Sequence, residues 1–114
     1  MPPKANPLRL NSLQRKTLAI LQALADDPRT STNFPETGEV LITQFPLPHG
    51  NHFHVGDAVV MAKDATGLRN EAVWRALERK GLARGEFPIA IHLTPSGLLY
   101  DTGMRDQILN RHSH

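Results

Sequence analysis

Residues 59–82 constrain the fold of this 114-residue chain more than any other part of its sequence. Their apolar side chains recur at the spacing of two short helices joined by a tight turn, since Val73 and Leu77 lie about one helical turn apart. Leu68, which follows Gly67, is expected to fill the turn between the helices. The residues expected to face inward on the first helix are Val59, Val60 and Ala62. The segment therefore predicts a packed pair of helices, the second over about residues 70–80.

The second predicted helix presents polar and charged side chains on the face opposite its apolar stripe. Arginine, lysine and asparagine side chains suit the phosphates and base edges of a nucleic-acid duplex. We therefore expect contacts with double-stranded DNA from Arg69, Asn70, Glu71, Trp74, Arg75, Arg79, Lys80 and Arg84. A solvated helix face with ordinary ion pairs is the alternative, because Glu71 and Glu78 dilute the positive charge.

The expected DNA contacts differ along this helix. Arg75, with Asn70 or Glu71, is expected to meet base edges in the major groove. The residues expected to neutralise phosphates are Arg79, Lys80 and Arg84. For Trp74, the only tryptophan, packing is favoured over contact with a thymine methyl or a sugar, because tryptophan usually buries most of its surface.

Charge is distributed unevenly along the chain, although its formal net value is only +2. Basic residues also occur near its start, at Lys4, Arg9, Arg15 and Lys16. A continuous positive stripe from the second helix to Arg15 and Lys16 favours DNA as the partner. Interruption of that stripe favours a protein partner, and the acidic residues placed to interrupt it are Glu71, Glu78 and Glu86.

The order of several short marks resembles the winged helix-turn-helix domains of bacterial transcriptional regulators, especially the MarR and PadR types. The marks are Ala62, Thr66-Gly67-Leu68, Val73, Leu77, Lys80-Gly81-Leu82, Leu93-Thr94 and Gly97. The resemblance implies an α+β fold with three core helices, a small antiparallel sheet and a DNA-binding regulator of transcription that acts as a homodimer. Winged helices also serve as protein-interaction modules, so a protein partner without DNA binding is the alternative function.

The remaining segments predict a single domain over residues 9–114, preceded by a disordered stretch at 1–8. Asn11 and Gln14 have the spacing of a capping box, which places a helix start there. The helix is expected to end at Asp26-Asp27-Pro28. Its expected buried stripe consists of Leu13, Thr17, Ile20, Leu21 and Leu24.

Two hairpins are predicted, one on each side of the second motif helix. After a loop at residues 29–39, the extended segments 39–45 and 52–55 are expected to pair with each other as an extra hairpin. Residues 83–84 and 89–93 are expected to form the wing.

A final helix over about residues 95–110 completes the predicted fold. Thr94 and Pro95 mark its start, since a hydroxyl cap followed by proline is typical of a helix N-terminus. Its expected buried residues are Leu98, Leu99, Met104 and Ile108.

Composition excludes several classes of function. The chain has no cysteine, and its sequence holds no phosphate-binding glycine loop and no catalytic His-Asp pair, so we expect neither an enzyme nor a cofactor. No apolar run is long enough to span a bilayer, which predicts a cytoplasmic protein without membrane contact. His49, His52 and His54 are closely spaced, and with His92 they could bind a metal, but a chance cluster is the preferred interpretation and no metal site is predicted.

Overall fold

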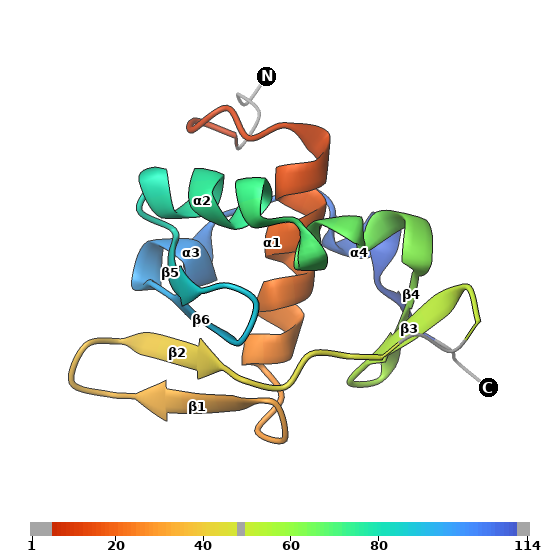
Figure 1. The fold of residues 1–114 in the computed structure, drawn as a ribbon, viewed down its shortest axis with the longest axis horizontal. Coiled ribbons are helices and arrows are strands. Elements are labelled where there is room, and N and C mark those ends of the chain that lie inside the picture. The colour runs from red at the N-terminus through yellow and green to blue at the C-terminus, as the bar shows by residue number, and fades with distance from the viewer. Residues whose placement is uncertain (1–5, 48–49, 112–114) are drawn as a thin grey trace.

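The computed structural model describes residues 6–47 and 50–111, and the helix α1, Ser12–Ala25, runs through the middle of the molecule (Figure 1). Its predicted capping box is confirmed. The backbone N–H of Gln14 donates to the side chain of Asn11 over 2.8 Å, and the Gln14 side chain accepts from the backbone N–H of Asn11 over 2.9 Å. The predicted stripe is buried apart from Leu13, which is half-buried, and Asp26 ends the helix.

The described residues form an α+β fold with four α-helices and two small antiparallel sheets. The larger sheet has the order β1-β2-β6-β5. Its strands are β1 (Ser31–Phe34), β2 (Glu39–Ile42), β5 (Ala83–Glu86) and β6 (Ala90–Leu93). Ile42 of β2 lies opposite Ile91 of β6, and both side chains are fully buried against the core. The paired β5 and β6 confirm the hairpin predicted after the second motif helix.

The predicted loop at residues 29–39 is wrong in part, because Ser31–Phe34 forms strand β1. Its four residues are polar apart from Phe34 and lack the alternating pattern of a half-buried strand. Pairing with β2 supplies its backbone hydrogen bonds instead. This strand therefore depends on its neighbour and not on its own side chains.

The predicted extra hairpin is wrong, because its two segments lie in different sheets. The strands of the smaller sheet are β3 (His52–Val55), β4 (Ala58–Met61) and β7 (Asn110–Arg111). The two segments predicted to pair are both extended, but β2 pairs with β1 and β6, whereas β3 pairs with β4. A two-residue turn at Gly56-Asp57 joins β3 to β4, and Gly56 has a φ of 59°. Such a φ suits the tight turns that close hairpins between adjacent strands.

The first helix predicted for the helix pair is also wrong. Residues 58–61 form β4, and two short 3-10 helices follow, η1 (Ala62–Asp64) and η2 (Thr66–Arg69). Burial alternates along β4, which fits a strand with one face against the core. The turn itself is placed as predicted, because Leu68 is buried and a Cβ on Gly67 would lie 1.9 Å from Oγ1 of Thr17. Only glycine allows η2 to lie this close to α1.

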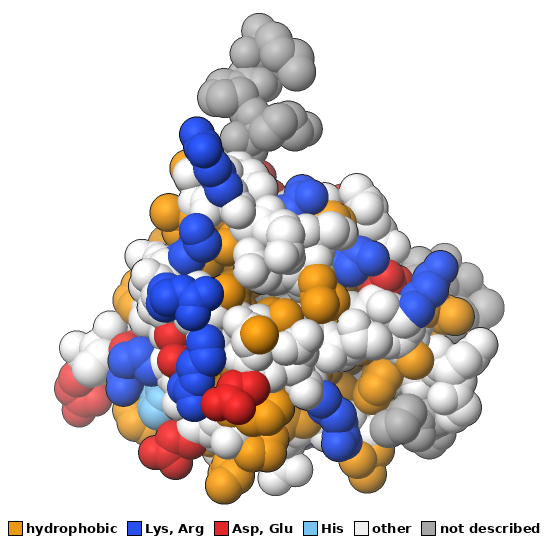
Figure 2. All heavy atoms as spheres, turned by 45° about the horizontal axis from the view of Figure 1, so that its top comes forward, with side chains coloured by type: hydrophobic (Ala, Val, Ile, Leu, Met, Phe, Trp, Pro, Cys, Tyr) orange, Lys and Arg blue, Asp and Glu red, His pale blue; other side chains and the backbone are white. Residues whose placement is uncertain are grey.

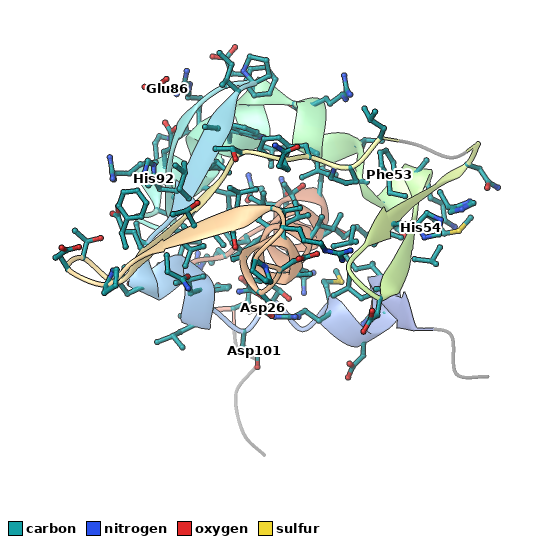
Figure 3. The ribbon with its side chains drawn as sticks, turned by 90° about the horizontal axis from the view of Figure 1, so that it is seen from below. Asp26, Phe53, His54, Glu86, His92 and Asp101 are labelled. Atoms are coloured by element: carbon teal, nitrogen blue, oxygen red, sulfur yellow. The ribbon has the colours of Figure 1, made fainter. Side chains whose placement is uncertain are left out.

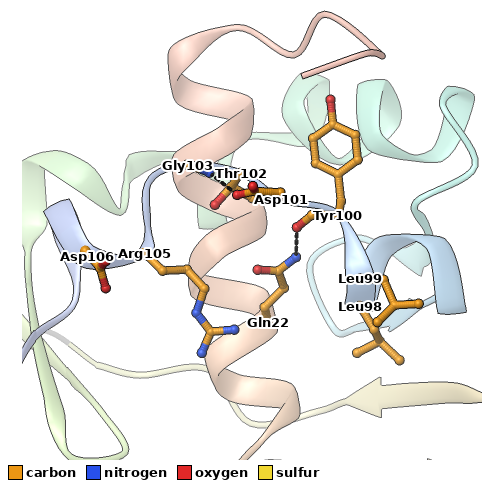
Figure 4. A pocket seen from close by; sticks show the side chains of 9 residues that line it. All are labelled: Gln22, Leu98, Leu99, Tyr100, Asp101, Thr102, Gly103, Arg105 and Asp106. Atoms are coloured by element: carbon orange, nitrogen blue, oxygen red, sulfur yellow. Dashed lines mark hydrogen bonds between the residues drawn. The ribbon is translucent and has the colours of Figure 1, made fainter. Parts of the chain in front are cut away.

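The C-terminal part is two short helices and not the single helix predicted. They are α3 (Pro95–Leu99) and α4 (Arg105–Ile108), and the predicted Thr94 cap is confirmed, since its hydroxyl accepts from the backbone N–H of Gly97 over 3.1 Å. Buried Gln22 donates to the carbonyl of Gly97 over 2.9 Å. It also donates to the carbonyl of Tyr100 over 2.8 Å (Figure 4). These bonds satisfy carbonyls at the end of α3, where the helix stops.

The burial expected along that helix is confirmed in part. Met104 and Ile108 are buried, and Leu98 is half-buried. Leu99 is 84% exposed and is the last residue of α3.

Of the predicted disordered stretch, residues 1–5 lie outside the described part of the chain. The prediction is wrong for residues 6–8, since Asn6 and Leu8 form hydrogen bonds to the rest of the protein. No helix within residues 6–47 and 50–111 is both long enough and apolar enough to cross a membrane.

Candidate nucleic-acid interface

Helix α2, Glu71–Arg79, lies where the second motif helix was predicted. Asn70 caps it, because the Asn70 side chain accepts from the backbone N–H of Ala72 over 3.0 Å. The side facing α1 and β5 is apolar and buried, and the predicted inward residues Val73 and Leu77 both belong to it. The opposite side is open to solvent and carries the charged residues of the helix.

Trp74 belongs to the buried side of α2 and is removed from the predicted contact surface. Its side chain is 0% exposed. The ring packs edge-on against Phe87 with centroids 4.9 Å apart, and it lies tilted against Phe45 at 5.8 Å. The prediction that Trp74 packs inside the protein is therefore confirmed. The alternative, a direct contact of Trp74 with DNA, is wrong, because none of the indole is exposed.

Arg75, the predicted base-reading residue, is held between two carboxylates of its own helix. Its Nη2 lies 2.9 Å from Oε2 of Glu71, and its Nη1 lies 3.0 Å from Oε1 of Glu78. Hydrogen bonds to Glu78 and then to Glu71 raise the pKa of Arg75, so the guanidinium stays protonated. Oε2 of Glu78 also accepts from the backbone N–H of Gly85 over 2.9 Å, which links α2 to β5. Both terminal nitrogens of Arg75 are therefore already engaged by carboxylates of α2.

Arg84 forms an ion pair that was not predicted, with Glu39 of β2. Its Nε donates to Oε2 of Glu39 over 3.2 Å, across the sheet from β5 to β2. The same hydrogen-bonded pair lowers the pKa of Glu39 and raises that of Arg84. The charge of Arg84 is thus offset in the free protein, although its side chain is 61% exposed.

Of the predicted contact residues, the basic ones at the two ends of α2 are the most accessible to a ligand. Arg69 precedes the helix, and Arg79 and Lys80 lie at its end; all three are exposed, and the described residues give them no ion pair. Figure 2 shows Lys and Arg side chains following one another down one edge of this face, with acidic side chains among the lower ones. The stripe does not reach Lys16 as a free charge, because Lys16 pairs with Asp64 at 2.9 Å.

A groove lies beside η2 that was not predicted from the sequence. It has a volume of about 800 Å³ and lies between residues 43–47, β3, the two 3-10 helices and the β5–β6 connection. The lining is largely apolar, with Arg69 at its rim; it includes Phe45, Leu47, Phe53, Leu68 and Ile89. The exposed apolar side chains Leu47 and Ile89 were the signal for it, but an isolated apolar residue at a surface is common.

The described histidines of the predicted cluster, His52, His54 and His92, lie in two different sheets. His52 and His54 share one face of β3, with ring centroids 5.0 Å apart. His92 lies in the other sheet, where its ring meets Phe34 edge-on at 5.8 Å, and Figure 3 shows His92 and His54 on opposite sides of the molecule. His49 is outside the described residues, and no three His, Asp or Glu side chains in the described ranges are grouped to hold an ion.

Comparison with known proteins found no matching family model, no matching curated protein and no matching solved structure.

Proposed function

We propose that the chain is a DNA-binding regulator of transcription that places the exposed side of α2 in the major groove. The observation that carries this proposal is the distribution of charge around α2. Exposed cations lie at both ends of the helix, while its buried side is fixed against α1 and β5. A helix held rigidly by its apolar side, with positive charge at its ends, suits a groove flanked by phosphates.

The arrangement around α2 supports a winged-helix form of this binding. The β5–β6 hairpin follows α2 directly. Strand β6 pairs with β2, and both of these strands contact α1. In this proposal η1 and η2 take the place of the first motif helix. The hairpin connection contains Phe87, Pro88 and Ile89 and no basic residue, so DNA contact is assigned to α2 and its flanking residues.

The proposed mechanism is binding in two stages. Arg69, Arg79 and Lys80 neutralise phosphates first, because they have no carboxylate to leave among the described residues. Base contact by Arg75 follows, when a guanine replaces Glu71 as its partner. As an extension of the proposal, the regulator is cytoplasmic and binds near-palindromic sites as a homodimer.

The test of this function is the salt dependence of binding to a random-sequence duplex, measured by fluorescence anisotropy. If three residues contact phosphates, log affinity should fall with log salt at a slope of about −2.7. Arg79→Ala should make that slope shallower by about 1. The control is Arg105→Ala, which removes one positive charge from α4, where Arg105 pairs with Asp26 at 3.2 Å. Absence of binding, or binding that ignores salt, contradicts the proposal.

A second prediction concerns the carboxylate beside Arg75. Glu71→Gln removes an exposed negative charge from the face that is proposed to meet DNA and releases one partner of Arg75. Affinity for duplex DNA should rise about fivefold, which corresponds to roughly 1 kcal/mol for a pair of like charges about 4 Å apart in water. Glu36→Gln, in the turn between β1 and β2, is the control with the same charge change. Equal effects of the two variants would show that α2 does not face the duplex.

A protein-binding module is the second candidate function, and two observations favour it. The carboxylates of Glu71 and Glu78 and the Lys16–Asp64 pair interrupt the positive stripe, and an apolar groove lies beside η2. The groove opens beside η2 and exposes Leu47 and Ile89, each 70% exposed. Apolar surface of this kind is typical of protein contacts more than of phosphate contacts. The salt titration with the random-sequence duplex separates the two functions. If the wild-type protein does not bind DNA, the protein-binding module becomes the better-supported function.

A further inference from the structure

Arg9 has an unusual backbone conformation that suggests a role for its side chain. Its φ is 58°, and it is the one non-glycine residue with positive φ in the described part of the chain. The left-handed region disfavours residues with a Cβ, so surrounding contacts must hold Arg9 there. Its side chain is nevertheless exposed, and the described residues offer it no ion-pair partner.

The contacts that hold this conformation come from Asn6 and Tyr100. Oδ1 of Asn6 accepts from the backbone N–H of Leu10 over 3.0 Å, and its Nδ2 donates to the carbonyl of Leu10 over 3.0 Å, which closes a turn around Arg9. The Tyr100 hydroxyl donates to Oδ1 of Asn6 over 2.6 Å and accepts from the backbone N–H of Leu8 over 3.2 Å. Leu10 is buried in the core below the turn. The chain thus fixes the backbone on both sides of an exposed arginine.

This turn lies on the same side of the molecule as the end of α2. Tyr100 follows α3, and Thr94, the cap of α3, donates to the carbonyl of Gly81 just after α2 over 2.7 Å. In Figure 1 the segment before α1 passes above α2 toward the end where α2 finishes. Figure 2 shows Lys and Arg side chains following one another down one edge of the molecule.

We propose that Arg9 is a further phosphate-contacting residue, and that Asn6 and Tyr100 are positioning residues that hold the backbone around it on the side of the molecule where α2 ends. The partner is the phosphate backbone of duplex DNA, because an exposed guanidinium on a fixed backbone, without a carboxylate partner among the described residues, is suited to an anion. This inference rests on the proposed DNA binding and extends its footprint beyond α2.

The experiment compares four proteins in the salt titration with a random-sequence duplex: wild type, Arg9→Ala, Tyr100→Phe and the double variant. Alanine keeps the Cβ of Arg9, so the backbone preference changes little while the guanidinium is lost. Tyr100→Phe keeps the ring and removes only the hydroxyl that bonds Asn6 and Leu8. Each single variant should make the salt slope shallower, Arg9→Ala by about 0.9 for one lost phosphate contact. Arg105→Ala should leave the slope unchanged.

The double variant separates positioning from a general structural role. If Tyr100 acts through Arg9, Tyr100→Phe should have no effect on the slope in the Arg9→Ala background. An equal effect in both backgrounds overturns the positioning role, and wild-type behaviour of Arg9→Ala overturns the phosphate contact while leaving the function of α2 intact. A wild-type protein that does not bind DNA overturns the proposed function and this inference together.

Discussion

Replacing Trp74 with alanine should lower the free energy of unfolding by about 3 to 5 kcal/mol. The indole is fully buried between α2 and the hairpin, in contact with the rings of Phe45 and Phe87. Its removal leaves a cavity at the point where α2, the β5–β6 connection and the segment after β2 meet. Denaturant titration monitored by circular dichroism measures the loss, since the variant has no tryptophan fluorescence.

Two further variants show whether this loss comes from packing. Trp74→Phe retains an aromatic ring against Phe87, so its cost should be less than half that of Trp74→Ala. Arg79→Ala lies on the exposed side of the same helix and should change stability by less than about 0.5 kcal/mol. A denaturation midpoint for Trp74→Ala equal to that of wild type would falsify the buried position of the indole.

Gly97→Ala is the second substitution with a large expected effect. A Cβ at residue 97 would lie 2.0 Å from the carbonyl oxygen of Leu82 and 3.0 Å from its carbonyl carbon, and both are backbone atoms. Backbone cannot rotate away as a side chain does, so α3 must move from the chain that follows α2. We expect a loss of about 3 kcal/mol, at the upper end of the usual cost of overpacking.

The neighbouring residue provides the control for this substitution. Ser96 lies on the same short helix and is exposed, so Ser96→Ala should change stability by less than about 0.5 kcal/mol. Both variants are compared by their denaturation midpoints. Equal midpoints for Gly97→Ala and Ser96→Ala would show that α3 does not pack against the Leu82 backbone.

The predicted elements that hold are those whose signals are local. Asn11 and Gln14 satisfy each other's backbone groups within one helical turn, and Thr94 caps α3 over a similar distance. The second motif helix was predicted at 70–80 and is found at Glu71–Arg79, because its apolar spacing identifies the buried side. In these cases the residues that determine the element lie within it.

The apolar run before the turn shows why the first motif helix was mispredicted. Ala58, Val59, Val60 and Met61 are too few to distinguish a helix from a strand by periodicity. Pairing with β3 and β7 decides the matter, and β7 lies some fifty residues further along the chain, at Asn110–Arg111. Such a distant partner cannot be identified from the spacing of apolar residues.

The candidate interface also has features that the sequence predicts and features that depend on tertiary contacts. The basic residues around α2 can be read directly from the chain, and their exposure at the ends of the helix follows from its apolar stripe. The pairing of Arg84 with Glu39 depends on β2 and β5 lying in one sheet, and the turn that holds Arg9 depends on a bond to Tyr100. The sequence by itself determined the caps, α1, α2 and the positions of the charges, since these depend on neighbours within a few residues. Only the tertiary structure decided the strand pairing, the aromatic partners of Trp74 and the pairing of Lys16 and Arg84, because these depend on contacts between segments far apart in the chain.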